Sequence, residues 1–290
     1  MALLTIAIPT YNRADILDNT LSSITSDPSF DDRVEILVSD NCSTDHTPEV
    51  VSKYPQVKYF RNEENVRDKN FPIAVSKGTG KYVHLHNDTV TFNEGKLAKI
   101  LSVLEQEADT GRNVLFINNN DFIQNKQVVI SNKNELVKTI SFHITWIANF
   151  GVWGKDFQAM TDVDKFSDTQ LQQIEWLFSI VSLENRKTLV VADNFYTTYP
   201  LQKKGSYNIF DVFVTNYFAS LDRNKISRFA IEVEKYRLLR YFIYRWFILL
   251  SKETDYEYEL DNANKTIFSS YWYEVYYYIF ITYVYIRKYI

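Results

Sequence analysis

Residues 3–9 read LLTIAIP, a continuous apolar run rich in strand-forming residues that ends at a proline. Residues 14–24 follow as ADILDNTLSSI, in which apolar side chains recur at the spacing of one helix face. Residues 34–40, VEILVSD, are a second apolar run that ends in polar residues. This order predicts a strand, a helix and a second strand, which is the unit from which parallel sheets are built.

The alternation of strands and helices continues to about residue 88. The further expected elements are a helix over 47–54, a strand over 57–60, a helix over 70–78 and a strand over 81–88. Such alternation favours an α/β fold with a mostly parallel sheet flanked by helices, in which ligands bind beyond the carboxyl ends of the strands. Residues 9–13, 40–45 and 86–89 should therefore lie along one edge of the sheet.

Composition excludes several classes of protein. The chain has 290 residues, of which 46% are hydrophobic and 23% charged, so it can bury a large core. Its net charge of -4 gives no global basic excess, which argues against a nucleic-acid partner. Neither GxGxxG nor GxxxxGK[ST] occurs, so a dinucleotide site or a P-loop is disfavoured.

The single cysteine and the N-terminus bear on the compartment. Cys42 has no second cysteine with which to form a disulfide, and we expect it to be a small buried residue in a reducing environment. The start of the chain, MALLTIAIPTYNR, lacks the charged and long apolar regions of a signal peptide and reads as a strand that enters a loop. We therefore expect a cytoplasmic protein.

Three blocks of the first part of the chain resemble the nucleotide-binding blocks of the inverting family-two glycosyltransferases, which have the GT-A fold. The blocks are TIAIPTYNRADILDNTLSSI at 5–24, EILVSDNCSTDHT at 35–47 and ENVRDKNFPIAVSKGTGKYVHLHND at 64–88. The resemblance implies an enzyme that moves a sugar from a nucleotide-diphosphate donor to a hydroxyl of a surface glycan or of a lipid-linked oligosaccharide. A catalytically weak GT-A module that binds nucleotide sugar or scaffolds glycan assembly is the alternative.

The resemblance also implies a divalent metal, Mn²⁺ or Mg²⁺, at the end of the strand over 81–88. In the family this strand ends in Asp-x-Asp, whose last carboxylate binds the metal that bridges the donor pyrophosphate. Asp88 occupies that last position, whereas His86 replaces the first aspartate and Asn87 fills the variable position. His86 is expected to contact ribose or to join the metal's ligands, which would favour Mn²⁺. A polar strand end that only caps a loop is the alternative.

Other positions match donor-binding residues of the family. They are Pro9, Thr10, Tyr11, Arg13, Asp40, Asp68, His86 and Asn87. By this match Tyr11 lies against the nucleobase and Arg13 near phosphate or structural acids. Asp40 is expected to accept from an imide N–H of the base, which favours uridine or thymidine over cytidine. Asp45 is expected to cap the following helix.

An inverting transferase needs a general base that takes the proton of the acceptor hydroxyl. Relatives supply it from an aspartate at the start of a helix well after the metal strand. Residues 166–181, FSDTQLQQIEWLFSIV, place Asp168 at the start of an amphipathic helix, so Asp168 is the expected base. Plain capping of that helix is the alternative role, and Asp162, Asp164 and Glu175 are alternative bases.

Two weaker assignments concern the acceptor and a lid. Trp153 stands between two glycines and is expected to contact the acceptor sugar, with packing as the alternative. Lys203 and Lys204 lie in YPLQKKGSYN, at the place where GT-A enzymes keep a mobile lid over the donor phosphates. A solvated turn is the other interpretation of this segment.

From residue 208 the sequence becomes helical and aromatic, so we predict domains at 1–207 and 208–290. Residues 235–252, KYRLLRYFIYRWFILLSK, place Arg237, Arg240 and Arg245 on one arc beside aromatic residues. This pattern is typical of helices at an anionic membrane surface. Packing within the protein or in a homo-oligomer is the alternative.

Overall fold

The computed structural model describes residues 1–199, 205–250 and 257–289, which divide into two units. The N-terminal unit comprises Met1–Asn132 and Trp146–Tyr199, and the helical unit comprises Lys133–Thr145 and Pro200–Ile290. The boundary therefore falls after Tyr199, whereas the sequence placed it after residue 207. The segment Lys133–Thr145 belongs to the helical unit, which local sequence did not indicate.

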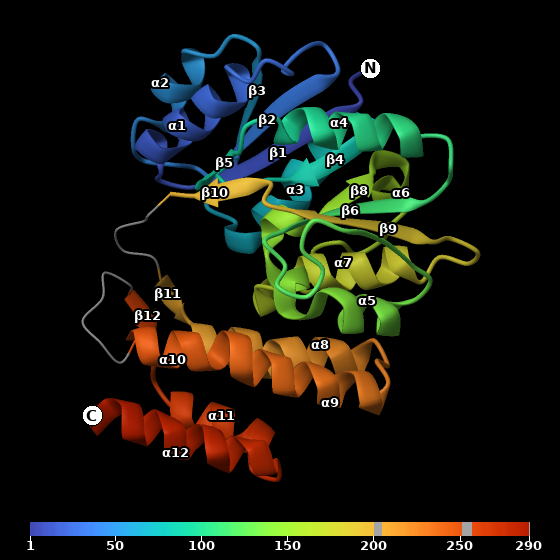
Figure 1. Ribbon diagram of the computed structural model, residues 1–290. Helices are drawn as coiled ribbons and strands as arrows, with labels where there is room; N and C mark the ends of the chain where they lie inside the picture. Colours follow the sequence, from blue (N-terminus) through green and yellow to red (C-terminus); the bar gives the residue numbers. More distant parts are fainter. Residues whose placement is uncertain (200–204, 251–256, 290) are drawn as a thin grey trace. The chain divides into compact units, whose positions relative to one another are not determined.

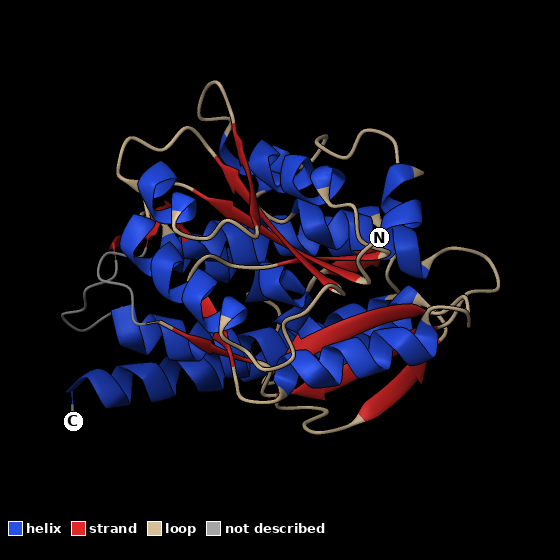
Figure 2. Ribbon diagram, turned by 90° about the horizontal axis from the view of Figure 1, so that it is seen from above, coloured by secondary structure: helices blue, strands red, loops and turns tan. Residues whose placement is uncertain are grey.

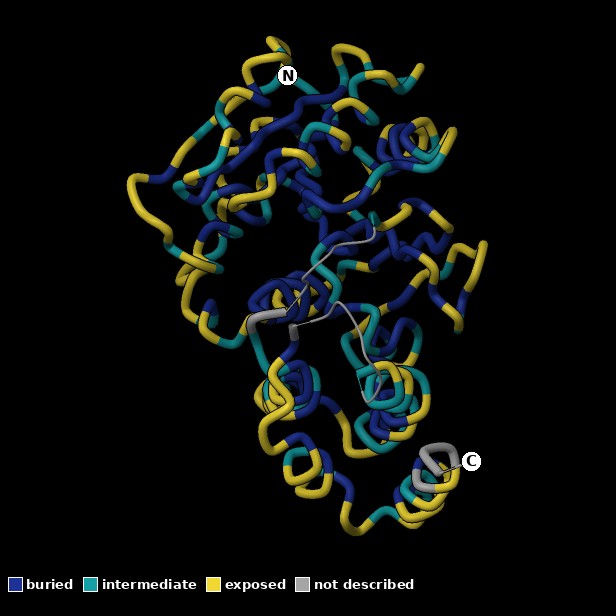
Figure 3. Tube along the Cα trace, turned by 90° about the vertical axis from the view of Figure 1, so that its left-hand side faces the viewer, coloured by how far each residue is buried: buried dark blue, intermediate teal, exposed yellow. Residues whose placement is uncertain are grey.

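The N-terminal unit is built on a five-stranded sheet in the order β3-β2-β1-β4-β8 (Figure 1). Its strands are β1 (Leu4–Thr10), β2 (Val34–Asp40), β3 (Val57–Arg61), β4 (Tyr82–Leu85) and β8 (Gly151–Trp153). All neighbours pair in parallel except β4 and β8. Every residue of β1 and β2 is buried (Figure 3), which explains their continuous apolar sequences.

Helices lie on both sides of these strands (Figure 2). They are α1 (Ala14–Thr25), α2 (Thr47–Ser52), α3 (Asn70–Lys77), α4 (Lys96–Glu107), α6 (Gly154–Gln158) and α7 (Gln172–Val181). The apolar face predicted for residues 14–24 packs with β1, since Leu17 and Leu21 share a core cluster with Ile6. The expected elements through residue 88 are confirmed with small shifts of their ends.

The remaining strands of the N-terminal unit form a three-stranded sheet and a short ribbon. The three-stranded sheet contains β6 (Asn113–Asn118), β9 (Thr188–Asp193) and β7 (Gln127–Ile130), and the ribbon pairs β5 (Val90–Phe92) with β10 (Tyr196–Thr198). The Tyr82 hydroxyl donates to the Val114 carbonyl at 2.7 Å and so joins β4 to β6. A Cβ at Gly151 would lie 2.2 Å from that hydroxyl, so only glycine fits there.

The helical unit combines two segments of the chain. Its elements are α5 (Lys133–Ile140), β11 (Gly205–Asn208), α8 (Tyr217–Arg223), α9 (Arg228–Arg237), α10 (Tyr244–Leu250), β12 (Glu257–Glu259), α11 (Ala263–Tyr271) and α12 (Val275–Tyr289). Glu234 of α9 is fully buried and accepts from Ser141 Oγ at 2.6 Å and from the Tyr217 hydroxyl at 3.0 Å. These bonds fasten the first segment to the second.

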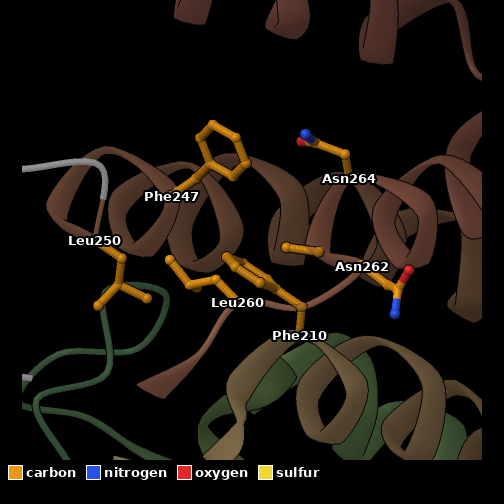
Figure 4. A pocket seen from close by; sticks show the side chains of 7 residues that line it. Phe210, Phe247, Leu250, Leu260, Asn262 and Asn264 are labelled. Atoms are coloured by element: carbon orange, nitrogen blue, oxygen red, sulfur yellow. The ribbon is translucent and has the colours of Figure 1, made fainter. Parts of the chain in front are cut away.

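The aromatic residues of α10 pack inside the helical unit. The Tyr244 ring contacts Phe280, and the Trp246 ring meets Tyr258 edge-on at 5.3 Å between centroids. Phe247 lines an apolar pocket together with Phe210, Leu250, Leu260, Asn262, Ala263 and Asn264 (Figure 4). None of these seven lining residues is ionisable, so their side chains offer no group for acid–base chemistry.

No helix within the described parts of the chain has the length and the apolar character needed to cross a bilayer. Exposed apolar residues gather instead on α11, α12 and the turn between them. They are Phe268, Trp272, Tyr273, Val275, Tyr278, Ile279, Tyr283 and Ile286, and we call them the aromatic face. The sequence predicted an exposed aromatic surface on α10, whereas the structure has one on α11 and α12.

Glu35 of β2 supports the amino-terminal side of the main sheet. It accepts from Thr5 Oγ1 at 2.5 Å and from Thr79 N at 2.8 Å, and it pairs with Lys58. Burial by itself raises the pKa of Glu35, but the bonds from Lys58, Thr5 and Thr79 outweigh it and lower the pKa to about 2. The ionised form therefore stabilises the fold.

We predict that wild-type stability falls more steeply with acid than that of Glu35→Gln. As the pH drops from 4.5, the ordinary pKa of a glutamate, towards about 2, the unfolded state binds a proton that the folded state does not bind, so stability is lost. The extra loss in wild type should be about 3 kcal/mol. Urea unfolding across this range measures it, with Glu105→Gln as an exposed-glutamate control. Parallel curves for wild type and Glu35→Gln would contradict the assignment.

Candidate functional site

The loops that follow β1, β2 and β4 meet at the carboxyl edge of the sheet, as predicted. Asn41 N donates to the Thr10 carbonyl at 2.9 Å, and Thr44 N donates to Asn12 Oδ1 at 2.7 Å. Asp45 accepts from Ala14 N at 2.9 Å and from Thr47 N at 3.1 Å, so one carboxylate serves the starts of α1 and α2. The expected capping of the second helix is limited to this bond to its first residue, since the cap position of α2 is His46, whose side chain makes no capping bond. The bond to the first helix was not foreseen.

Asp88 lies at the centre of this edge and is buried. Its Oδ2 accepts from Thr10 Oγ1 at 2.9 Å, and its Oδ1 accepts from Arg13 Nη1 at 2.8 Å. Its backbone carbonyl accepts from Thr20 Oγ1 at 2.9 Å. A carboxylate has about four acceptor positions, so each oxygen keeps one for a further ligand. Asp88 is therefore held in place from both β1 and α1.

His86 does not lie where the metal motif suggested. Its side chain is fully buried and stacks on Phe92 with centroids 5.0 Å apart and planes at 3°. Its Nε2 is 3.3 Å from the Val90 carbonyl, and burial lowers its pKa to about 4, so the ring is neutral at pH 7. A ring enclosed in this way is not placed to contact ribose or a metal ion.

The neighbours of His86 serve the loop and the core. Asn87 Oδ1 accepts from Thr89 N at 3.2 Å and from Thr89 Oγ1 at 2.8 Å, which shapes a tight turn. His84, two residues earlier on β4, is also buried, and its Nε2 lies 2.9 Å from the Tyr196 hydroxyl. Burial lowers the pKa of His84 well below its usual range. The side chains of His84 and His86, which precede Asp88 in the chain, are therefore packed in an aromatic core.

Asp40 is fully buried at the end of β2. Its Oδ1 accepts from Ser43 N at 2.9 Å and its Oδ2 from the Tyr59 hydroxyl at 2.6 Å. Arg61 Nε lies 3.8 Å from the same Oδ2. Sequence reasoning missed both β3 residues, although the parallel register pairs Asp40 with Arg61 and alternation puts Tyr59 on the same face.

Asparagine side chains fasten the loop between β3 and α3. Asn41 Nδ2 donates to Asn65 Oδ1 at 2.8 Å and to the Arg67 carbonyl at 3.2 Å, while its Oδ1 accepts from Val66 N at 2.9 Å. Asn70 Nδ2 donates to the Ser39 carbonyl at 2.8 Å. This network went unpredicted, although the repeated asparagines after two neighbouring strands were a signal. It ties residues 65–70 to the end of β2.

Asp68 and Asp168 come together although a hundred residues separate them. Burial, and next the negative charge of Asp168, raise the pKa of Asp68 to about 6, while Arg67 opposes the shift. The Gln172 side-chain amide donates to the Asp68 carbonyl and so joins the two segments. Asp168 is exposed in a 3-10 turn, Ser167–Thr169, and α7 begins only at Gln172. Asp168 therefore does not cap that helix.

The other acidic candidates have different surroundings. Asp164 lies 3.6 Å from Lys69 and is exposed, Asp162 is exposed in a loop, and Glu175 is buried on α7. Trp153 is buried, and its Nε1 donates to the Arg112 carbonyl at 2.7 Å. It is a packing residue and does not fit the expected acceptor contact.

Three further predictions concern donor contacts, the cysteine and the lid. Pro9 is buried in β1, whereas Tyr11 is 41% exposed and free to meet a ligand face. Cys42 is half-buried, with φ at 64°. Lys203 and Lys204 lie outside the described residues. Within those residues no three His, Cys, Asp or Glu side chains group as metal ligands.

Comparison with known proteins gives a consistent result. The family described as Glycosyl transferase family 2 matches residues 5–153. The abequosyltransferase RfbV of Salmonella typhimurium is 34% identical over 37% of this chain and 34% of its own length. GalNAc(5)-diNAcBac-PP-undecaprenol beta-1,3-glucosyltransferase of Campylobacter jejuni is 31% identical over 38% of this chain and 36% of its own. The matches thus span about a third of each relative.

The fold agrees with a solved structure. The crystal structure of TarS from S. aureus aligns with a TM-score of 0.57 and 17% identity over 85% of this chain and 44% of that one. At this identity the likeness concerns the fold alone. Together with the matched family, it confirms the α/β fold expected from the strand–helix alternation.

The coupling of the two carboxylates is open to direct measurement. We predict that Asp168→Asn lowers the pKa of Asp68 from about 6, because it removes the like charge. The fall should be partial, since burial is the larger cause. Carboxyl-carbon NMR titration measures it, and Asp164→Asn is the exposed control. An Asp68 pKa that stays the same in both variants would show that Asp168 exerts no charge effect there.

Proposed function

We propose that this chain, which belongs to glycosyl transferase family 2 and has the GT-A fold, transfers a sugar from a nucleotide diphosphate to an acceptor hydroxyl. The observation that carries the proposal is the meeting of Asp40, Asp88 and the Asp68–Asp168 pair around one edge of the sheet. Hydrogen bonds join Asp88 to Thr10, Thr10 to Asn41, which follows Asp40 in the chain, and Asn41 to the carbonyl of Arg67, which precedes Asp68. Base recognition, diphosphate binding and proton removal each have a candidate there.

The donor would enter between the loops after β1 and β2. Asp40 is fully buried beneath Ser43 and Tyr59, so an imide N–H of uracil would reach its carboxylate by displacing the Tyr59 hydroxyl from Oδ2. The exposed ring of Tyr11 offers a face for the base. The charged fork of Arg13 suits phosphate oxygens. These features favour a UDP-sugar.

A single carboxylate with spare acceptor positions fits a hard divalent cation, which proteins often bind through one or two carboxylates and the substrate's phosphates. Asp88 would hold the ion, and the bound ion would neutralise the charge that develops on the departing diphosphate. Since His86 is enclosed in the core, it supplies no imidazole ligand that would favour Mn²⁺. A carboxylate ligand suits both Mg²⁺ and Mn²⁺, so Asp88 by itself favours neither.

Asp168 would act as general base in an inverting reaction. It accepts the proton of the acceptor hydroxyl while that oxygen attacks the anomeric carbon from the face opposite the diphosphate, whose bond to the sugar breaks. Asp68 lies beside it, and burial together with the negative charge of Asp168 raises the pKa of Asp68 to about 6. The exposure of Asp168 leaves room for an acceptor.

The acceptor would be part of a surface glycan or carried by a lipid, and the enzyme would work at the cytoplasmic face of a membrane. The aromatic face supports this, because exposed Trp, Tyr and Ile side chains gain free energy at the lipid–water boundary. Glu274, which lies between Tyr273 and Val275 in the sequence, is paired with Lys235 at 3.0 Å. Of the three arginines predicted to face the membrane, Arg237 donates to the Lys138 carbonyl, whereas Arg240 and Arg245 are exposed.

A GT-A module without catalytic turnover is the second candidate, and the Arg13–Asp88 ion pair favours it because it occupies the metal position. Thermal-shift measurement with UDP, GDP and CDP sugars, with and without Mn²⁺ or Mg²⁺, tests donor binding. UDP with metal should raise the melting temperature most, by mass action. Donor hydrolysis or transfer then separates an enzyme from a binding module. Stabilisation by none of the nucleotides would contradict both.

We predict that Asp168→Asn lowers kcat at least about a hundredfold, the usual contribution of a general base, while donor affinity barely changes. Asp164→Asn, an exposed aspartate of the same loop, is the matched control and should keep kcat. Steady-state kinetics and calorimetry with UDP measure the two quantities. Full turnover in Asp168→Asn would move the base to Asp68 or elsewhere.

We also predict that Trp272→Ser combined with Ile279→Ser abolishes flotation with liposomes that mix zwitterionic and anionic lipids. Both side chains are more than half exposed on the aromatic face, at 55% and 68%. Phe229→Ser, which alters an aromatic residue 70% exposed on α9, is the control and should leave flotation intact. A wild-type dimer that ignores liposomes at every salt concentration would favour protein contact instead.

A further inference from the structure

The Arg13–Asp88 ion pair joins two groups of very different exposure. The Arg13 side chain is 44% exposed, whereas that of Asp88 is 2% exposed. The other side chain on the Asp88 carboxylate is that of Thr10, which brings a hydrogen bond but no charge. An ionised carboxylate enclosed in protein needs a counter-charge, and Arg13 supplies it across 2.8 Å.

We infer that Arg13 is a positioning residue that exchanges partners, from Asp88 in the empty site to the diphosphate of the donor once metal and nucleotide have bound. The inference rests on the proposed function, since it takes Asp88 as the metal position. A divalent cation on Asp88 Oδ1 would sit beside the guanidinium that now occupies that oxygen. Like charges at that distance repel strongly in a buried setting, so the two occupants exclude each other.

Arg13 is placed to make this exchange. It directly precedes α1, with φ -139° and ψ 37°, which is outside the helical region, and its side chain reaches solvent. Among the ion pairs of the described residues, Asp88 is its one partner. Its planar fork can bind two phosphate oxygens at once, whereas Asp88 takes only one of its nitrogens. The diphosphate is therefore the better partner when it is present.

The formal charges cancel in both arrangements. In the empty site Asp88 and Arg13 neutralise each other. In the filled site the two negative charges of a donor diphosphate match those of the cation, and Asp88 and Arg13 again balance. Metal without nucleotide, however, would expel Arg13 without offering it a phosphate. The exchange therefore makes metal and nucleotide bind cooperatively, each strengthening the other by the same factor.

The affinity for Mn²⁺ in the absence of nucleotide tests this exchange. Electron paramagnetic resonance of free Mn²⁺ gives it for wild type, Arg13→Gln and Arg13→Lys, with and without UDP. We expect Arg13→Gln to bind Mn²⁺ without UDP about tenfold more tightly than wild type, because the competing charge is gone. UDP should still strengthen Mn²⁺ binding through its phosphates, but by a smaller factor than in wild type. Arg13→Lys keeps the positive charge and should bind Mn²⁺ as wild type does. It shows whether an effect of Arg13→Gln comes from the lost charge or from any substitution at this position.

Two controls separate charge from other effects. Thr10→Val removes the neutral bond to Asp88 and should leave the dependence of Mn²⁺ binding on UDP in place. Arg33→Gln removes an exposed arginine that pairs with Asp31 and Glu105, and should change nothing. Equal Mn²⁺ affinity in wild type and Arg13→Gln without UDP would overturn the exchange while UDP binding by wild type still supports the transferase. A wild type that binds no UDP would overturn both.

Discussion

β1 hydrogen-bonds to β2 on one side and to β4 on the other, and all three strands run in the same direction. Their carboxyl ends therefore coincide, and the residues just beyond them converge although they lie far apart in sequence. In this register Thr10 is opposite Asp40 and within reach of Asp88. A shift by one residue would move every side chain of β1 to the opposite face of the sheet and separate Thr10 from Asp88.

Much of this arrangement is predictable from sequence because it follows from local periodicity and one rule of topology. Apolar runs of strand length, separated by one amphipathic helix, specify a parallel pair without knowledge of the rest of the chain. Asp45 was predictable for the same reason, since capping depends on residues close in sequence. Family resemblance then assigned roles to Asp40 and Asp88, whose places at the strand ends agree with it.

What sequence could not provide depends on distant partners. His86 has the chemistry of a ligand, and its burial results from Phe92 and Tyr196, which the ribbon of β5 and β10 brings over it. Trp153 likewise became a packing residue because Tyr82 and Arg112 surround it. Asp168 was expected at a helix start, but the helix begins at Gln172, whose side chain instead reaches Asp68. In each case the residue type is compatible with either a binding role or a structural role, and tertiary contacts determine which one the residue has.

The helical unit takes one of its pieces from the middle of the chain. During synthesis α5 and Ser141 leave the ribosome well before α9 and Glu234, and the whole of Trp146–Tyr199 is made in between. The apolar side chains of α5 therefore stay exposed until the rest of the helical unit has been synthesised; they are Leu136, Val137 and Ile140. Exposed apolar surface of this kind makes a nascent chain prone to aggregation. A chain cut after Tyr199 would keep α5 and lose α9. Truncation at this point therefore cannot yield the N-terminal unit without an uncovered segment of the helical unit.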